Sequence, residues 1–218
     1  MMAIEMNKED FTNRLKKLIE ITDLNEWTKD FLASVSDYYM RKGSISEKQM
    51  KVFEKIECQH SDEARAKREA WRDSYNDEMR DIAKVCASYY LKAGYFVDLA
   101  TSVIEDESFI PTEKAWKAMC SNKYAMKVRD AVYGIPKFAV GSMIMVRKST
   151  PGGGATLERY RHKVGTDLAI VISNDEPVVS ACRGNRAYKI LFVGDSTAQF
   201  AEERDLRQLP KKLSNLKK

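Results

Sequence analysis

The sequence predicts an α+β protein, with a helical domain over residues 1–134 and a small five-stranded β-barrel over residues 135–209. Before residue 134, apolar residues recur at the three- and four-residue spacing of amphipathic helices. After it, short apolar runs alternate with glycine, proline and asparagine, which is typical of strands joined by turns. A chain of 218 residues is long enough to form both domains.

The first two helices are predicted by hydrophobic periodicity and by capping residues. Phe11 and Leu15 lie on one face of a short helix that ends near Thr22. A second helix begins around Asn25, where Asn25 or Asp23 can cap it, and ends at Gly43. We expect its apolar side to carry Trp27, Phe31, Val35, Tyr38 and Tyr39.

A third helix is predicted by a capping box. Ser46 is a good N-cap, Gln49 can return a hydrogen bond to the Ser46 backbone, and Ile45 can pack on Met50. The second and third helices should therefore form a helical hairpin near residues 25–57. We expect the residues packed between them to be Trp27, Phe31, Val35 and Phe53.

The hairpin reads Phe-Leu-Ala-Ser-Val, then Lys-Gly-Ser-Ile-Ser-Glu-Lys-Gln-Met, then Glu-Lys-Ile within residues 28–57. This order resembles a short helical module of uncharacterised bacteriophage proteins, several of them near DNA-metabolism functions. The resemblance implies a phage-encoded protein and no particular activity, and we expect the helical domain to engage a protein partner. The alternative is a hairpin that only packs, because capping and periodicity account for its residues.

A long helix is predicted near residues 61–92. Its first part, residues 62–69, is polar with alternating charges, whereas its later part is amphipathic and ends at Gly94. Residues 95–104 form another short helix, and Pro111 opens the next one. Five or six helices should thus precede the strands.

The predicted strands are short runs rich in β-branched and aromatic residues, each closed by turn formers. They cover residues 143–146, 168–172, 178–182 and 187–193, and a run at 138–141 leads into the first of them. About 75 residues cannot bury two large sheets, so a closed or half-closed barrel is the economical way to hide the strand edges.

Two segments of this part match a known barrel pattern. Phe138-Ala-Val-Gly-Ser-Met-Ile-Met-Val-Arg147 provides an opening strand, and Glu202-Glu-Arg-Asp-Leu-Arg-Gln-Leu209 provides a short helical turn before a final strand. The layout resembles an SH3-like barrel of the KOW or Tudor kind. The chain departs from the KOW pattern because it lacks a clean G-x-x-G-x-V unit.

The positive charge of the chain lies in its C-terminal part. Residues 135–218 hold 15 lysines and arginines against eight acidic residues, whereas residues 1–134 hold 22 against 24. We expect the cations to gather on loops and strand ends, where they would attract the phosphates of DNA or RNA, and Tyr160 or Tyr188 could stack on an unpaired base. The predicted nucleic-acid-binding residues are Arg147, Lys148, Arg159, Tyr160, Arg161, Lys163, Arg183, Arg186 and Lys189.

Three functional hypotheses follow from this pattern. The first is a non-enzymatic accessory protein that binds nucleic acid, or a nucleic-acid-processing machine, through the basic barrel. The second is a protein-interaction module, either a host-protein modulator or a virion component, because an acidic partner suits the same basic surface. The third is an enzyme whose site is assembled from dispersed residues such as Asp167, Asp175 or Asp195 with Arg183.

No cofactor, metal or catalytic motif is predicted. The run Gly152–Gly154 lacks the lysine, the hydroxyl and the following helix of a phosphate-binding loop. Cys58 and His60 have no further ligand at zinc-finger spacing, and no orienting acid is implied for His162 with Cys182. The four cysteines are scattered singly, which suits reduced thiols.

The sequence contains no apolar run of membrane-spanning length and begins with no secretion signal. We therefore expect a cytoplasmic protein without a membrane partner, in the host cytoplasm if it is phage-encoded. Residues 210–218 are predicted to be a basic tail that adds phosphate affinity. The oligomeric state does not follow from the sequence.

Overall fold

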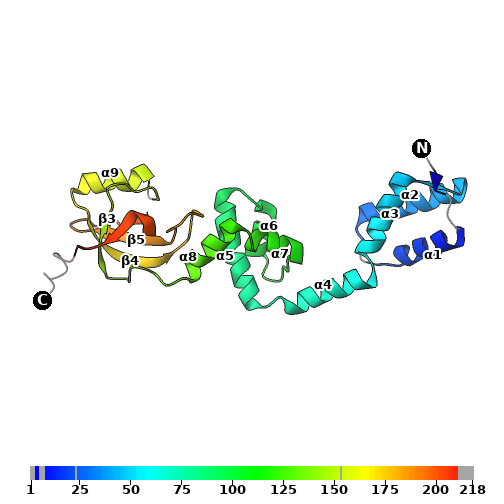
Figure 1. The fold of residues 1–218 in the computed structure, drawn as a ribbon, viewed down its shortest axis with the longest axis horizontal. Helices are drawn as coiled ribbons and strands as arrows, with labels where there is room; N and C mark the ends of the chain where they lie inside the picture. Colours follow the sequence, from blue (N-terminus) through cyan, green and yellow to red (C-terminus); the bar gives the residue numbers. More distant parts are fainter. Residues whose placement is uncertain (1–2, 5–7, 23, 153, 211–218) are drawn as a thin grey trace. The chain divides into compact units, whose positions relative to one another are not determined.

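The computed structural model describes residues 3–4, 8–22, 24–152 and 154–210, so nearly all of the predicted basic tail lies outside the described residues. The chain folds into two compact units, Met1–Asp73 and Ser74–Lys218. The fold is α+β, with helices in both units and a five-stranded antiparallel sheet in the second (Figure 1). The expected domain boundary at residue 134 thus lies inside the second unit. Among the described residues, no helix combines the length and the hydrophobicity that crossing a lipid bilayer requires.

Three helices surround the core of the first unit. They are α1 (Lys8–Ile19), α2 (Glu26–Lys42) and α3 (Glu47–Gln59), accompanied by a short antiparallel pair, β1 (Ala3–Ile4) with β2 (Ile45–Ser46). The Phe11 ring lies 4.5 Å from the Tyr39 ring and 4.9 Å from the Phe53 ring, measured between centroids. All three residues are buried, so each helix contributes one aromatic side chain to the core of the first unit.

The predicted helix caps are present in this unit. Asn25 Oδ1 accepts a hydrogen bond from the backbone N–H of Thr28, and Gly43 ends α2 in the left-handed conformation. Ser46 Oγ accepts from the Gln49 backbone N–H at 3.2 Å, and Gln49 Oε1 accepts from the Ser46 backbone N–H at 3.0 Å. The capping box therefore satisfies backbone donors that would otherwise lack partners at the start of α3.

Trp27 was expected to be buried, but it lies on the surface. Its side chain is 63% exposed and stacks on Phe31, with ring centroids 5.6 Å apart. The buried stripe of α2 contains Thr28, Leu32, Val35 and Tyr39, which places Trp27 one residue away from the buried side. Because one residue turns a helix by about 100°, Trp27 faces solvent.

Two helices replace the single long helix predicted near residues 61–92. α4 (Asp62–Ser74) has no buried residue, and α5 (Asp77–Ala93) begins after a break at Tyr75 and Asn76. Asn76 has extended backbone angles, and its side chain accepts a hydrogen bond from the Met79 N–H at 2.9 Å. An asparagine that caps a new helix in this way ends the preceding one.

Three further helices pack with α5 in the second unit. They are α6 (Val97–Glu105), α7 (Glu113–Cys120) and α8 (Lys123–Tyr133). Asn122 separates α7 from α8, because its Oδ1 accepts hydrogen bonds from the Tyr124 and Ala125 N–H groups. Their shared core contains Ile82, Ala83, Cys86, Ala87, Tyr90, Ala100, Val103, Met119, Cys120 and Ala125.

The sheet of the second unit has the strand order β6-β5-β4-β3-β7, and every neighbouring pair is antiparallel. Its strands are β3 (Met143–Val146), β4 (Leu168–Glu176), β5 (Ala187–Phe192), β6 (Gln199–Glu202) and β7 (Leu206–Gln208). A 3₁₀ turn, η1 (Glu203–Asp205), precedes β7, where the sequence predicted a helical turn before the last strand. The sheet is open, and a closed barrel is not seen.

One face of the sheet is covered by a helix that the sequence analysis did not predict. α9 (Gly154–Val164) lies against it in Figure 1, and Leu157, Tyr160 and Val164 pack on the sheet residues. Residues 178–182, predicted as a strand, form no strand. Instead Val178 packs on Val128 and Ala131 of α8, so contact with the helices outweighs the β-propensity of the run.

We predict that Ser46→Ala weakens the start of α3 by about 1 kcal/mol, the usual cost of losing an N-cap. Amide hydrogen exchange in the first turns of α3 should accelerate about fivefold, since 1.4 kcal/mol corresponds to a factor of ten. Ser34→Ala, on an exposed position of α2, is the matched control and should leave exchange in α3 unchanged. Equal protection in Ser46→Ala and wild type would contradict a stabilising capping box.

Candidate nucleic-acid interface

The nine residues predicted to bind nucleic acid lie in three places in the second unit. One group follows β3, a second is on α9, and a third lies on β5 and in the loop before it. Six of the nine are exposed cations, namely Arg147, Lys148, Arg159, Lys163, Arg183 and Lys189. The other three, Tyr160, Arg161 and Arg186, are wholly or partly buried.

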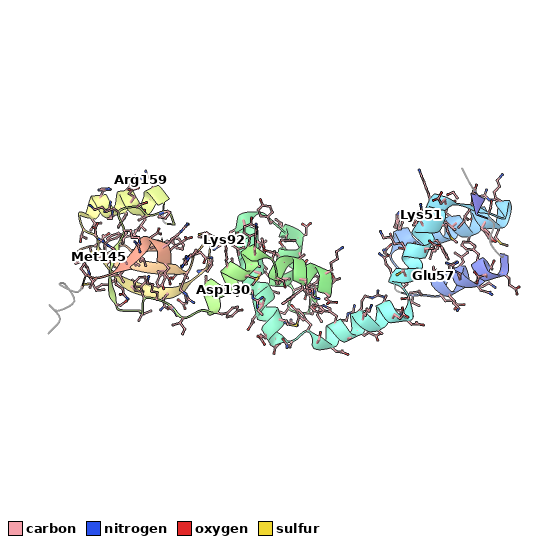
Figure 2. The ribbon with its side chains drawn as sticks, in the orientation of Figure 1. Lys51, Glu57, Lys92, Asp130, Met145 and Arg159 are labelled. Atoms are coloured by element: carbon pink, nitrogen blue, oxygen red, sulfur yellow. The ribbon has the colours of Figure 1, made fainter. Side chains whose placement is uncertain are left out.

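The exposed cations lie on more than one side of the sheet. Arg159 and Lys163 are on the outer side of α9, and Figure 2 shows Arg159 pointing away from the sheet that carries Met145. Lys189 alternates with buried Tyr188 and Ile190 along β5, so it points from the face opposite α9. The structure therefore brings Arg159 and Lys163 together and separates Lys189 from them.

Arg161 and Arg186 hold the fold together and are not available to a ligand. Arg161 is 9% exposed, and its Nη1 lies 2.8 Å from Asp167 Oδ1, which ties the end of α9 to the start of β4. Arg186 is 8% exposed and donates to main-chain carbonyl oxygens of Val132 and Asn174 at 3.1 and 3.2 Å, and also to that of Gly134. The second arginine thus joins the end of α8 to β4.

Tyr160 and Tyr188, the aromatic residues predicted to stack on a base, make contacts inside the second unit. Tyr188 is fully buried, and its hydroxyl donates to Glu203 and accepts from the Lys137 N–H. Burial raises the pKa of Tyr188 to about 12. Tyr160 packs on Phe192, with ring centroids 5.9 Å apart, so its inner face is not open to a base.

The basic row on α9 consists of Arg159 and Lys163. The two residues are four positions apart, so they are neighbours on one helix face. Lys163 Nζ lies 5.5 Å from the centre of the Tyr160 ring. The pKa of the Asp195 carboxyl is lowered, mainly by a hydrogen bond from Tyr160 and to a smaller extent by the charge of Lys163. Within the described part of the chain, neither cation forms an ion pair.

The glycine-rich loop does lead into a helix, unlike the sequence prediction, but its backbone is occupied. The Gly152 N–H donates to Asp205 Oδ1 at 2.8 Å. A Cβ atom at Gly152 would lie 2.6 Å from the Glu202 side chain and 2.7 Å from Asp205 Oδ2, so only glycine fits there. Because two internal carboxylates fill this position, a phosphate would meet like charge.

A cavity of about 380 Å³ lies where the loop before β5 meets α8. Its lining includes Lys127, Asp130, Cys182, Arg183 and Glu203. The Cys182 Sγ lies 2.9 Å from Ser180 Oγ and 3.8 Å from Glu202 Oε2. His162 lines a different cavity and lies 3.2 Å from the Arg161 guanidinium, so the fold does not assemble a pair from this histidine and Cys182.

The carboxylates named for a dispersed enzyme site interact with different neighbours. Asp167 pairs with Arg161, Asp175 accepts a hydrogen bond from Ser173 at 2.6 Å, and Asp195 lies beside Tyr160. Each therefore has a separate local partner. Among the described residues, no group of three or more histidine, cysteine, aspartate or glutamate side chains could hold a metal ion.

The sequence analysis missed an aromatic pocket on the helical side of the unit. A hollow of about 530 Å³ is lined by Tyr89, Tyr90, Tyr95, Phe96, Ala118, Asn122 and Tyr124. The signal that could have found it is the pair of adjacent aromatic doublets on either side of Gly94. Tyr124, which α8 contributes to the pocket, comes near these doublets only through tertiary packing.

Comparison of the chain with protein families, with curated proteins and with solved structures finds no match. The resemblances to a phage helical module and to an SH3-like barrel therefore depend on the residue patterns alone.

We predict that Arg186→Met destabilises the second unit by about 3 kcal/mol, because several buried carbonyl groups lose their donor. Arg183→Met, three residues away and exposed, should change stability by less than about 0.5 kcal/mol. Urea unfolding followed by circular dichroism measures both variants. Equal stability of the two would contradict a structural role for Arg186.

Proposed function

We propose that this protein is a non-enzymatic accessory protein of a phage type, acting in the cytoplasm, that binds nucleic acid or a nucleic-acid-processing machine with little base specificity. The binding surface is the side of the second unit formed by α9. The single observation that supports this most directly is the exposed basic row of Arg159 and Lys163, which forms no ion pair among the described residues. Exposed cations that form no ion pair are the electrostatic requirement for holding phosphates.

The surrounding charge supports the same proposal. The C-terminal part has an excess of basic residues, and several of its acids are engaged inside the fold. Glu202 pairs with Arg204 at 2.7 Å, Asp167 pairs with Arg161, and Asp205 accepts backbone hydrogen bonds. Lys148 and Arg147, in the segment that leads toward α9, add positive charge that remains exposed. The net field outside the sheet is therefore expected to attract polyanions.

We also propose that the sheet curls into an SH3-like barrel. β6 and β7 are the two edges of the sheet, yet only the three residues of η1 connect them. Four extended steps span at most about 14 Å. The edges of a flat five-stranded sheet would lie about 19 Å apart. A curled sheet would bring β6 and β7 within the distance that η1 can span. The strand order and the 3₁₀ turn before the last strand also support an SH3-like barrel.

The expected mode of binding is backbone contact without base reading. The outer side of α9 presents Arg159 and Lys163 beside Glu158, and carries no exposed asparagine or glutamine for base edges. Affinity should therefore depend steeply on salt and weakly on sequence. Binding that persists at several times physiological ionic strength would contradict this mode.

A protein-interaction module is the second candidate, and two exposed apolar surfaces favour it. The face of the sheet opposite α9 carries partly exposed apolar side chains, namely Met143, Met145, Leu168, Ile170, Ile172, Leu191, Val193 and Phe200. In the first unit, the stacked pair of Trp27 and Phe31 offers a site for a protein partner. Such surfaces often bind proteins.

We predict that the double variant Arg159→Glu with Lys163→Glu lowers affinity for DNA and RNA at least tenfold near 0.1 M salt. The slope of log affinity against log salt should fall by about 2, since two phosphate contacts are lost. Fluorescence anisotropy with labelled single-stranded and duplex oligonucleotides measures both quantities. Arg161 is left unchanged because its loss would disturb α9.

The control is Lys48→Glu with Lys55→Glu, which makes the same change in net charge on exposed positions of α3. It should bind nearly as well as wild type. If wild type and both double variants bind nucleic acid equally poorly, the accessory role in nucleic-acid binding is wrong and the protein-interaction candidate gains support.

A further inference from the structure

The aromatic pocket is built from four helices of the second unit. Tyr89 and Tyr90 come from α5, Phe96 caps the start of α6, Ala118 lies on α7 and Tyr124 lies on α8. Tyr95, Phe96 and Tyr124 are 67%, 42% and 48% exposed, which is unusual for large aromatic side chains so close together. The volume of about 530 Å³ lies within the range of small-ligand sites, about 300–1,000 Å³.

The floor of the pocket is rigid. Tyr90 is buried, its ring meets the Phe96 ring edge-on at 5.0 Å, and its hydroxyl donates to Asn122 Oδ1 at 2.9 Å. Asn122 is itself held by backbone groups at the junction of α7 and α8. The floor therefore has no free polar group directed into the pocket from these two residues.

Phe96 is held in a costly conformation. Its φ of 53° and ψ of 30° place it in the left-handed region, and it is the one non-glycine residue with positive φ in the described chain. Such strain is maintained where the surroundings determine it, and it is concentrated at ligand sites. In this protein the strain turns the Phe96 ring against Tyr90 and leaves its other side exposed.

One cation is placed beside the pocket by its contacts. Lys123 Nζ lies 5.0 Å from the centre of the ring of Tyr124, a lining residue. Among the described residues, no carboxylate lines the hollow. The surface thus combines stacking rings with a positive charge next to them.

We propose that this pocket takes an unpaired base of a single-stranded nucleic acid, an inference that rests on the proposed function and specifies its ligand. The exposed rings of Tyr95, Phe96 and Tyr124 supply stacking faces, and Lys123 supplies a positive charge for a neighbouring phosphate. Burial, and to a smaller extent the neighbouring Tyr124 and Tyr95, raises the pKa of Tyr89. The Tyr89 hydroxyl therefore stays protonated and can donate to a base edge.

The observations favour a base over the two other ligands that aromatic pockets bind. A methylated ammonium group is attracted to an aromatic cage, but here Lys123 beside Tyr124 would repel it. An apolar peptide would fit the rings, yet it would leave the charge of Lys123 without a partner group. A neutral ring attached to a phosphate matches both features.

The test compares three ligands on the full-length protein by fluorescence anisotropy. They are oligodeoxythymidine about 20 nucleotides long, an abasic oligomer of equal length that keeps the phosphates, and a duplex. Wild type should bind the base-bearing strand about tenfold more tightly than the abasic one. Tyr95→Ala and Tyr124→Ala should each remove most of this preference while binding to the abasic oligomer and to the duplex stays unchanged.

Two variants serve as controls. Tyr95→Phe keeps the ring and should retain the preference, and Tyr133→Ala removes an exposed tyrosine of α8 that does not line the pocket. Should an alanine variant fail to fold, the wild type provides a second measurement by NMR. The aromatic proton signals of Tyr95 and Tyr124 should shift with oligodeoxythymidine and not with the abasic oligomer.

The possible outcomes distinguish failure of the base pocket from failure of the proposed function. Equal binding of the base-bearing and abasic strands overturns the base pocket and leaves nucleic-acid binding intact. A preference that persists in both alanine variants also overturns the pocket. If none of the three polyanions binds, the proposed function fails, and binding of a proline-rich or aromatic peptide at these residues would then assign the pocket to a protein ligand.

Discussion

A fully buried aspartate holds the sheet of the second unit together. The Asp205 carboxylate accepts hydrogen bonds from the backbone N–H groups of Gly152 and Glu202 at 2.8 and 2.9 Å, and its carbonyl oxygen accepts from the Arg147 N–H at 2.7 Å. Hydrogen bonds to a charged acceptor contribute about 1.5–3 kcal/mol each. These bonds connect the end of β3, the loop that leads into α9 and the 3₁₀ turn, so the position of the basic row depends on this one side chain.

The same logic explains why two of the eight predicted cations, Arg161 and Arg186, are not available to a ligand. A small sheet with short strands has many loop carbonyls and carboxylates to satisfy, and buried polar groups require partners. Arg161, Arg186 and Arg204 meet this need inside the unit. What remains outside is a smaller set of cations, and the functional proposals are restricted to those residues.

The sequence predicted the charge of the C-terminal part better than the placement of its cations. The basic excess after residue 135 is correct as a count, but a count does not distinguish Arg159 on the surface from Arg161 two residues later. The helix that carries both was missed because the preceding glycines and the basic run suggested a loop. Leu157, Tyr160 and Val164 have helical spacing, and this signal predicts α9.

The aromatic pocket shows the complementary case. Tyr89 and Tyr90 lie in the amphipathic later part of the long helix that the sequence predicted, and only Tyr90 is buried. Tyr124 reaches the same hollow from more than 30 positions further along the chain, through the packing of α5 against α8. Periodicity indicates that such residues face other elements, but it does not say whether they meet a core or an opening.

The sequence by itself determined the α+β class, the caps of α2 and α3, four of the five strands (β3, β4, β5 and β7) and the turn before the last strand, because these depend on neighbours within a few residues. Tertiary structure decided the break at Asn76, the loss of the strand at residues 178–182, and which arginines are buried. Those outcomes depend on contacts between residues tens of positions apart. Burial and charge pairing are properties of such contacts, and a linear pattern does not contain them.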